Sequence, residues 1–332
     1  MAVGYRSFLR VAPGQELLGT VIEHIGKWLA NKEIHLDAGR TGQYVLDHDD
    51  LVTIFRDRRP DGQLYQWRRR HPDAQPRDVW RTSITVLERP EAAGWIWTEI
   101  ETRDDRSAVG EEPYNKCMSV PGVLRVLLAR LASVDGRTET APSPQWVTAG
   151  HLPDLMDYLA DETRRGPVYM ISQGDAPRED FERWAREITW HLVGLGTAFL
   201  VDNAVEEEFN EMVGPAHYLP RGTMRTYLPE VDLDDPEDPL RHKILGRSRI
   251  VATDTRRLAR MLGRAERDRA ARLPVPEDAR QVVRAYDSPA ATWREQQRRI
   301  HELQVENERL REALDARPRL HVAGRHEQLT AS

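Results

Sequence analysis

Hydrophobic positions first repeat at helical spacing near the start of the chain. Over residues 15–32 apolar side chains recur three and four positions apart, as they do on the buried face of a helix. These positions are Leu17, Leu18, Val21, Ile22, Ile25, Trp28 and Leu29. The same spacing predicts a second, shorter helix over residues 123–131. Both helices need an apolar surface to pack against.

The chain between these helices alternates instead with the period of two that is typical of strands. We predict strands over residues 64–68, 79–88 and 95–102, with a hairpin loop at 89–94. In the middle strand one side carries Trp80, Thr82, Ile84 and Val86, and the other carries Arg81, Ser83 and Thr85. This alternation predicts a half-buried antiparallel strand. Residues 1–135 are therefore expected to form an α+β domain.

A second domain is expected after residues 136–150, whose Gly, Thr, Ser and Pro content favours an exposed linker. The segments predicted next are strand 168–172, helix 178–193, strand 197–201, helix 204–212 and strand 223–228. This alternation predicts a small parallel βαβαβ sheet within residues 151–253. Residues 248–251 are a candidate fourth strand.

The C-terminal region is predicted to be helical. Asp254 is a suitable N-cap for a basic helix that ends near Leu273, before two prolines. Ser288 and Pro289 open a last helix, which reaches about residue 316. Residues 317–332 show no periodicity and are expected to be disordered. The expected fold class is an α+β lobe and a small α/β lobe, followed by helices that end in a coiled coil.

The last helix carries a heptad pattern. Trp293, Ile300, Asn307 and Leu314 occupy position a, and Gln296, Leu303 and Leu310 occupy position d. A single asparagine at position a favours a parallel, in-register dimer, and Glu306 and Arg311 would pair across it. Burial of the five apolar seam side chains contributes roughly 8–15 kcal/mol per chain before ordering costs, so the tail alone is marginal. The alternative is an amphipathic helix that docks on its own protein.

Composition limits the classes of protein that fit. Among 332 residues, 39% are hydrophobic and 31% charged, and no apolar run is long enough for a membrane span. We expect a cytoplasmic location and no membrane partner. The single cysteine, Cys117, excludes an intramolecular disulfide. Residues 1–150 hold 20 basic and 21 acidic groups, residues 151–255 hold 11 and 21, and residues 256–332 hold 17 and 12.

Two basic segments are candidates for nucleic-acid contact. The first combines Tyr65 and Trp67 with Arg68, Arg69 and Arg70, because aromatic rings stack on bases and arginines neutralise phosphates. A buried aromatic face with a solvated basic edge explains this segment equally well. The second is the arginine-rich helix, with Arg256, Arg257, Arg260 and Arg264. Its partner is either a nucleic acid or the acidic middle of the same chain.

Candidate ligand contacts lie where open α/β sheets bind ligands, beyond the carboxyl ends of strands. They are Asp175, Asp202, Arg225 and His242. Asp202 is more simply a helix N-cap. The acids between Asp232 and Asp238 fit a solvated turn better than a calcium loop. Neither a dinucleotide fingerprint nor a phosphate-binding loop occurs, so we expect no cofactor and no metal, and we assign no catalytic residue.

A resemblance adds a biological setting. The residues that carry it lie mainly within 168–245. They are Phe181, Trp184, Ile188, Leu192, Gly194, Ala198, Phe209, Gly214, Gly222, the run from Arg225 to Pro229, and Asp232. With the coiled coil that follows, this set resembles uncharacterised bacterial proteins found near restriction and phage-defence genes. The resemblance implies a setting and no reaction. Those proteins carry a longer coiled coil and a further domain, which this chain lacks.

The sequence thus favours a non-enzymatic interaction protein that self-associates through its C-terminal coiled coil and recruits another protein. One alternative is a nucleic-acid-binding subunit that uses the basic aromatic strand and the arginine-rich helix. A second alternative is a hydrolase, which requires Asp175, Asp202 and Arg225 to converge on a pocket.

Overall fold

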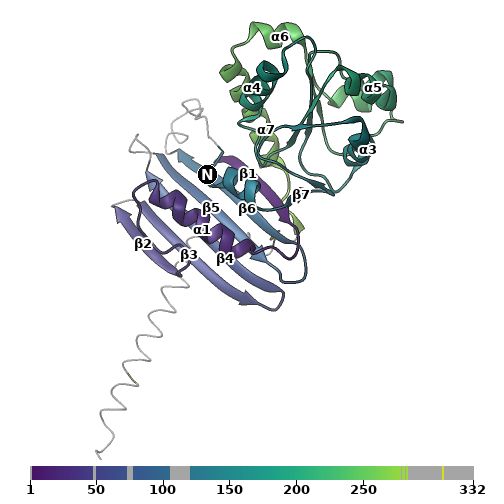
Figure 1. Ribbon diagram of the computed structural model, residues 1–332. Helices are drawn as coiled ribbons and strands as arrows, with labels where there is room; N and C mark the ends of the chain where they lie inside the picture. The colour runs from purple at the N-terminus through teal and green to yellow at the C-terminus, as the bar shows by residue number, and fades with distance from the viewer. Residues whose placement is uncertain are drawn as a thin grey trace, which may run out of the picture. The chain divides into compact units, whose positions relative to one another are not determined.

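The structure is a computed structural model that describes residues 2–47, 50–72, 78–104, 120–277, 279–280, 282 and 309. Residues 1–274 form one compact unit, and residues 275–332 form a second. The first unit contains two β-sheets with helices packed on them, which is a mixed α+β architecture (Figure 1). No helix among the described residues is both long and apolar enough to cross a membrane.

The first sheet has eight strands in the order β2-β3-β4-β5-β6-β1-β7-β8, and all neighbours are antiparallel. Its strands are β1 (Ala2–Val11), β2 (Gly42–Asp47), β3 (Asp50–Arg59), β4 (Gly62–Pro72), β5 (Asp78–Glu88), β6 (Gly94–Asp104), β7 (Ser133–Asp135) and β8 (Thr138–Glu139). The three predicted strands are confirmed as β4, β5 and β6. The sheet is larger than predicted because β1, β2, β3, β7 and β8 also belong to it.

Two helices supply the apolar core of this sheet. α1 (Leu17–Ala30) lies across one face of the sheet, and α2 (Gly122–Arg130) packs beside α1 (Figure 1). Val21, Ile25 and Leu29 of α1 are fully buried in one cluster with Trp67 of β4. The helical spacing read from the sequence therefore identified the side of α1 that faces the sheet.

The expected half-burial of β5 is wrong, because both of its sides have low exposure. Ile84 and Val86 belong to the apolar core, while Arg81, Ser83 and Thr85 on the other side are 8%, 5% and 2% exposed. The polar side is satisfied by neighbouring strands: Arg81 pairs with Glu101, and Gln66 donates to Thr85 over 3.2 Å. Cross-strand pairing of this kind lets polar side chains lie at low exposure.

The second sheet has the order β13-β12-β10-β11-β9. Its strands are β9 (Gln145–Trp146), β10 (Val168–Ser172), β11 (Thr197–Val201), β12 (Met224–Tyr227) and β13 (Ile244–Leu245). Strands β10 and β11 are parallel, as predicted, and β9, which was not predicted, is parallel to β11. β12 runs antiparallel to β10, and β13 runs antiparallel to β12. The predicted parallel sheet is therefore correct for its centre and wrong for β12.

The reversed direction of β12 follows from the path of the preceding helix. α5 (Asn203–His217) breaks at Gly214, whose φ of 71° lies in the left-handed region, and Pro215 follows. The chain then passes the carboxyl end of β10, where the Gly222 amide donates to Ser172 Oγ over 2.8 Å. β12 starts from that end of the sheet, so it must run opposite to β10.

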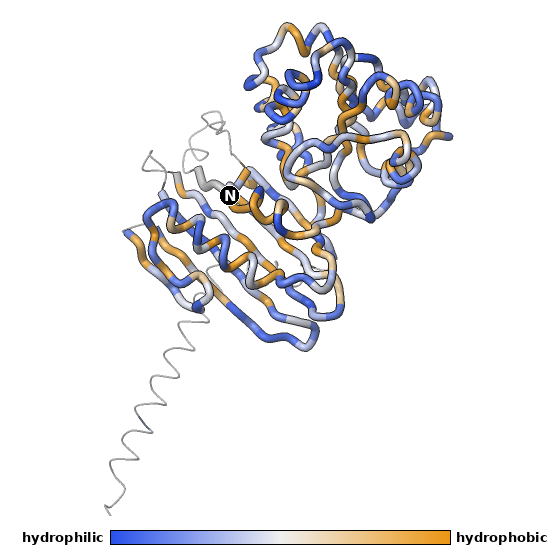
Figure 2. The backbone as a smooth tube through the Cα atoms, in the orientation of Figure 1, coloured by the Kyte–Doolittle hydropathy of each residue, from blue (hydrophilic) through white to orange (hydrophobic). Residues whose placement is uncertain are grey.

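Helices cover both faces of the second sheet. α3 (Leu152–Ala160) and α5 enclose one apolar cluster, and α4 (Arg178–Thr189) and α7 (Thr255–Arg272) enclose the other. Figure 2 shows hydrophobic residues concentrated in the inner strands, with the surrounding helices mostly hydrophilic. The layer order α/β/α explains why every residue of β10 and β11 is buried.

Two predictions for the connecting segments are wrong. Residues 136–150, expected to form an exposed linker, include β8 of the first sheet, β9 of the second sheet and the short 3-10 helix η2 (Ala149–His151). Residues 248–251 lie in helix α6 (Arg247–Ala252) instead of a strand. The predicted basic helix is confirmed as α7, and the Asp254 side chain caps it by accepting from the Arg257 amide.

Candidate functional site

The four candidate ligand contacts are used by the fold in different ways. Asp202 is the N-cap of α5, and its carboxylate accepts from the amides of Ala204 and Val205 over 3.1 and 2.9 Å. Asp175 is exposed and pairs with Arg247 over 2.8 Å. Arg225 is 2% exposed and donates to the carbonyl oxygens of Tyr218 and Ala216. Among the described residues, no hydrogen bond or ion pair joins Asp175, Asp202 and Arg225, so the convergence that a hydrolase would need is not found there.

A polar cluster that the sequence did not reveal lies at the carboxyl end of β10. Ser172 Oγ accepts from the Gly222 amide and donates to the carboxylate of Glu206, which stands in the first turns of α5. Both side chains are buried, at 3% and 4% exposure. Burial raises the pKa of Glu206, while the hydrogen bond from Ser172 and the charge of Arg221 lower it in part.

A hydroxyl next to a carboxylate is a pairing that nucleophilic sites use, but here it holds the chain in place. The Ser172 hydroxyl donates to Glu206, accepts from Gly222 and is only 3% exposed, so burial keeps it from contact with a substrate. The contacts fix Gly222 and the turn before β12 against the end of β10. We therefore interpret Ser172 and Glu206 as a structural clasp. A polar residue at the end of an otherwise apolar strand was the only sequence signal for it.

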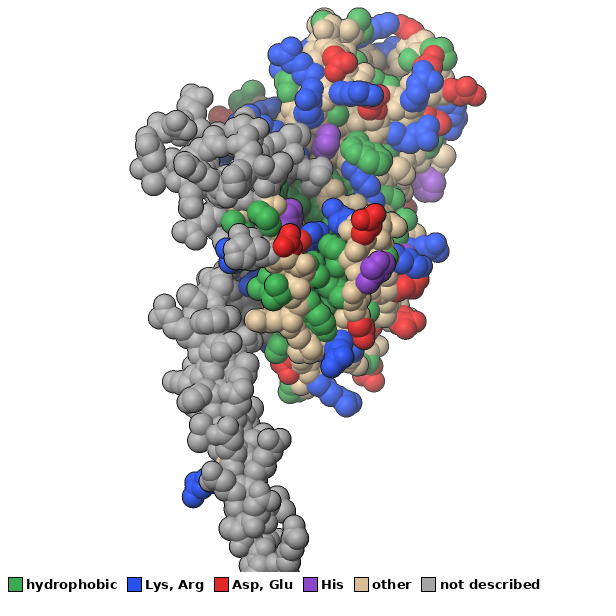
Figure 3. Space-filling model, turned by 90° about the vertical axis from the view of Figure 1, so that its left-hand side faces the viewer, with side chains coloured by type: hydrophobic (Ala, Val, Ile, Leu, Met, Phe, Trp, Pro, Cys, Tyr) green, Lys and Arg blue, Asp and Glu red, His purple; other side chains and the backbone are tan. Residues whose placement is uncertain are grey.

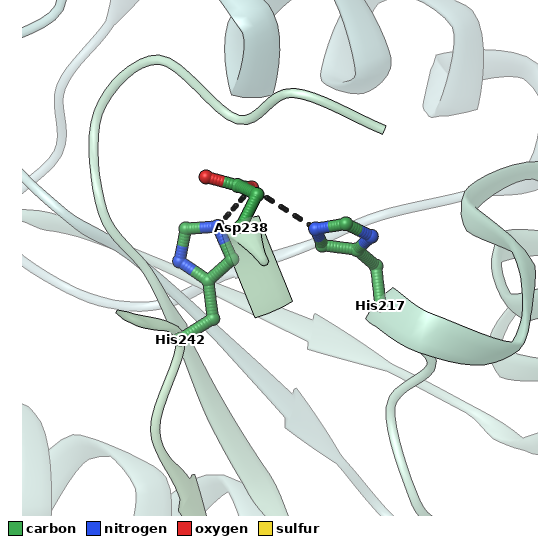
Figure 4. A group of neighbouring side chains, drawn as sticks. All are labelled: His217, Asp238 and His242. Carbon is green, nitrogen blue, oxygen red and sulfur yellow. Dashed lines mark hydrogen bonds and ion pairs between the residues drawn. The ribbon is translucent and has the colours of Figure 1, made fainter. Parts of the chain in front are cut away.

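A second polar cluster joins two histidines and an aspartate from separate parts of the α/β lobe (Figure 4). His217 ends α5, Asp238 opens the 3-10 helix η3 (Asp238–Arg241), and His242 follows η3. Nε2 of His217 and Nε2 of His242 lie 3.0 and 2.7 Å from the same carboxylate oxygen, Oδ2 of Asp238. All three side chains are buried. We call this group the His-Asp-His cluster.

The carboxylate of Asp238 is the electrostatic centre of this cluster. Besides the two imidazoles, it accepts from Arg241 Nε and from the Asp232 amide at 3.2 Å. Burial by itself would raise the pKa of Asp238, but the hydrogen bonds from Arg241, His217 and His242 outweigh it and lower the pKa to about 2. Asp238 is therefore ionised. The expectation of a solvated turn is wrong for Asp238, which is buried. It is correct for the other four acids of the segment, which are exposed: Asp232, Asp234, Asp235 and Glu237.

Carboxylates and imidazoles are also the side chains that bind transition metals in proteins. Whether this cluster could bind a metal therefore depends on which ring nitrogen carries the proton. The Leu228 amide donates to Nδ1 of His242 over 3.1 Å. Because Nδ1 accepts, the proton of the neutral ring lies on Nε2, where it is donated to Asp238. A metal at Nε2 needs that lone pair and leaves the proton on Nδ1, facing the Leu228 N–H. The ring orientation therefore does not fit a metal ligand.

The remaining contacts also tie the cluster to the fold. The Tyr227 hydroxyl donates to the His217 carbonyl oxygen, over 2.5 Å, and the Tyr227 ring lies 5.5 Å from that of His242. Burial lowers the pKa of His242, against the opposing effect of Asp238, which raises it. The neutral ring of His242, the ionised aspartate and the amides of Leu228 and Asp232 form one hydrogen-bonded network, whereas Nδ1 of His217 has no partner among the described residues. His242 thus anchors the segment that leads to β13.

The basic aromatic strand corresponds to part of β4, and its aromatic residues do not face a ligand. Tyr65 and Trp67 are fully buried in the core beneath α1, where the Tyr65 hydroxyl donates to the Ala38 carbonyl oxygen. Of the two readings of this segment, the structure therefore supports the buried aromatic face and not the stacking of these two rings on bases. Arg69 pairs with Asp50 over 2.6 Å, Arg68 donates to Ser83, and Arg70 is exposed.

The arginines of α7 are different, because Arg256, Arg257, Arg260 and Arg264 are all exposed. Arg256 has an 85% exposed side chain and lies 3.7 Å from Glu187 of α4, and Arg264 lies 3.9 Å from Asp268. In the view of Figure 3, basic and acidic side chains are interspersed over the surface of the described residues. Contacts with acids of the same chain thus account for part of the charge on α7.

The seam of the predicted coiled coil, Trp293, Gln296, Ile300, Leu303, Asn307, Leu310 and Leu314, lies outside the described residues, as does Cys117. Comparison with known proteins gives no further guide to the site: no family model, curated protein or solved structure matches the chain.

Proposed function

We propose that this chain is a non-enzymatic interaction protein that self-associates through residues 289–316 and presents its folded unit to another protein. The observation that carries the proposal is the heptad seam, in which Asn307 at position a favours a parallel dimer. The fold adds support, because Asp202, Arg225, Ser172, Glu206 and His242 direct their polar atoms to structural contacts. The resemblance to proteins encoded near phage-defence genes supplies the setting in which we place this role.

Light scattering of the full chain, compared with a chain that stops at Asp287, tests the proposal. We expect a dimer mass for the full chain and a smaller mass after truncation. A monomeric mass for both chains would overturn the proposal. The matched variants Asn307→Ile and Arg309→Ala distinguish the effect of a seam residue on self-association from that of a residue outside the seam. Asn307→Ile should strengthen self-association and relax the preference for dimers, while Arg309→Ala should leave the mass unchanged.

The exposed arginines of α7 favour a second function, binding to the phosphate backbone of a nucleic acid. Arginines on one exposed helix provide the charge that such contacts require, without any sequence readout. Replacing Arg256, Arg257, Arg260 and Arg264 together by Gln should abolish binding to a duplex at about 50 mM salt, and binding by the unaltered chain should fall steeply as salt rises. The control replaces Arg178, Arg183 and Arg186, three exposed arginines of α4. Absence of binding by the unaltered chain excludes this function.

A further inference from the structure

A cleft lies within the first unit, between the eight-stranded sheet and the α/β lobe. Its wall includes Arg6 and Phe8 of β1, Trp97 of β6 and Arg269 of α7, together with Arg165 of the loop before β10. Asp135 of β7 also lines it. None of these residues belongs to the His-Asp-His cluster, to the Ser172–Glu206 clasp or to the exposed face of α7.

The arginines of this cleft differ in their counter-charges. Arg6 pairs with Glu99, whose Oε1 lies 3.0 Å from Arg6 Nε, and Arg269 pairs with Glu266 over 2.7 Å. In the part of the chain that the structure describes, no carboxylate pairs with the guanidinium of Arg165, which donates to the Pro274 carbonyl oxygen over 2.8 Å. Its remaining N–H donors are available to a ligand in the cleft.

Repulsion among these arginines marks a place where an anion would be stabilised. Burial lowers the pKa of Arg165, Asp135 opposes this change, and the nearby charges of Arg269, Arg10 and Arg6 lower the pKa further. Because a guanidinium stays protonated in proteins, this unfavourable charge persists in the folded chain. An anion next to Arg165 would relieve the repulsion from all of its neighbours at once.

Asp135 does not supply that anion. Its two carboxylate oxygens accept from the backbone amides of Arg165 and Gly166, over 2.8 and 2.7 Å. Burial raises the pKa of Asp135, and these two amide hydrogen bonds only partly oppose the effect. The carboxylate is thus directed at the loop backbone, which it holds in place behind the Arg165 side chain.

The cleft also has an aromatic wall. Phe8 and Trp97 lie side by side with ring centroids 6.4 Å apart, and the guanidinium carbon of Arg165 is 5.8 Å from the centre of Phe8. Trp97 is only 2% exposed, whereas the Phe8 ring is half-buried.

From this arrangement we propose that the cleft binds a small phosphate-bearing ligand with an aromatic base, of the nucleoside monophosphate class. The phosphate is held by Arg165, with Arg6 and Arg269 beside it, because guanidinium groups match phosphate oxygens in geometry and charge. The base packs on the half-buried ring of Phe8, since nucleobases stack on aromatic faces. This site is independent of self-association through the C-terminal helix.

Isothermal titration of the full chain at constant ionic strength tests the site with three probes: inorganic phosphate, adenosine and adenosine 5′-monophosphate. We expect the monophosphate to bind most tightly, phosphate to bind more weakly, and adenosine to bind weakest. Arg165→Gln should weaken the monophosphate and phosphate by about tenfold or more, whereas Arg130→Gln, at an exposed arginine of α2, should change neither.

Phe8→Leu tests binding of the base separately from binding of the phosphate, and it remains informative if Arg165→Gln does not fold. It should weaken the monophosphate but leave inorganic phosphate unchanged. The proposal is overturned if neither phosphate probe binds up to about 10 mM, or if Arg165→Gln and Arg130→Gln behave alike. Binding of phosphate and the monophosphate with equal affinity would overturn the aromatic part and reduce the site to a simple anion site.

Discussion

The backbone N–H of Leu228 donates to Nδ1 of His242 over 3.1 Å, and this one contact determines which atom of the ring carries the proton. With the proton on Nε2, His242 donates to the ionised Asp238 and has no lone pair for a metal. The position of a main-chain donor thus separates a structural cluster from a metal centre built from the same residue types.

The first prediction concerns metal content. If His242 is a structural donor, zinc in the purified chain should not depend on it, and His242→Ala should leave the metal content measured by mass spectrometry unchanged. His151→Ala, at an exposed histidine, is the control. Loss of one equivalent of zinc in His242→Ala alone would show that the ring adopts the other tautomer and binds metal.

The second prediction concerns stability against pH. Burial lowers the pKa of His242, so the unfolded chain binds this proton more readily than the folded chain does. The contribution of a neutral His242 to stability is fully present above the unfolded pKa of about 6.5 and is lost as pH falls below it. Denaturant titrations of the unaltered chain and His242→Gln should show a difference that shrinks with acidification from about pH 7. A difference that does not vary with pH would contradict the assignment.

The same reasoning gives Asp238 a lower pH range. Its pKa of about 2 lies below the ordinary value near 3.9, so the carboxylate stabilises the fold above about pH 4 and this contribution is lost between about pH 4 and pH 2. Asp238→Asn should therefore destabilise the chain most at neutral pH and much less near pH 2. Asp234→Asn, at an exposed position two residues after Asp232, is the matched control and should show little effect at either pH.

The Ser172–Glu206 clasp predicts unequal effects for its two members. Ser172→Ala leaves a buried carboxylate without its donor and the Gly222 amide without its acceptor, so it should cost about 1–3 kcal/mol of unfolding free energy. Glu206→Gln keeps an oxygen acceptor for the Ser172 hydroxyl and removes a buried charge, so it should cost less. Urea denaturation at pH 7 compares them. Equal costs for both variants would argue against this account.

Two aspartates of the α/β lobe that follow neighbouring strands, one a helix cap and the other not, give a further comparison. Asp202→Ala removes two hydrogen bonds to the first turn of α5 and should cost about 0.5–2 kcal/mol. Asp175→Ala removes only an exposed ion pair with Arg247, which should change stability by less than about 1 kcal/mol. Thermal or denaturant unfolding would distinguish these outcomes, and a larger loss for Asp175→Ala would contradict the roles described here.

Local pattern predicted the elements of the fold better than their arrangement. The spacing of Val21, Ile25 and Leu29 identified the buried side of α1, and Asp254 correctly marked the start of α7. The direction of β12 could not be read in this way, because it depends on the break at Gly214 and on where the chain returns. Likewise, the short strands within 136–150 have too few residues to show a period: β8 forms by pairing with the neighbouring β7, and β9 forms by pairing with the distant β11.

The candidate site was harder to predict for the same physical reason. Asp202 was correctly given its more probable role as a cap, since a cap acts within its own helix. Asp238 was read only as part of a solvated turn, because its contact with His217 spans 21 positions and depends on how α5 ends. For Tyr65 and Trp67 the sequence left two readings open, a binding surface and a buried aromatic face. The sheet places both rings under α1, which is the second reading.

The helix α7 has a consequence for any attempt to divide the chain. Leu258, near its start, belongs to the core of the second sheet, and Ala270, near its end, belongs to the core of the first. Removing residues after 253 would therefore uncover apolar surface in both halves, whereas a cut after Pro274 would leave the first unit whole. Proteolysis in the intact protein should accordingly yield a resistant fragment that retains α7, and separately expressed halves should need this helix in order to stay folded.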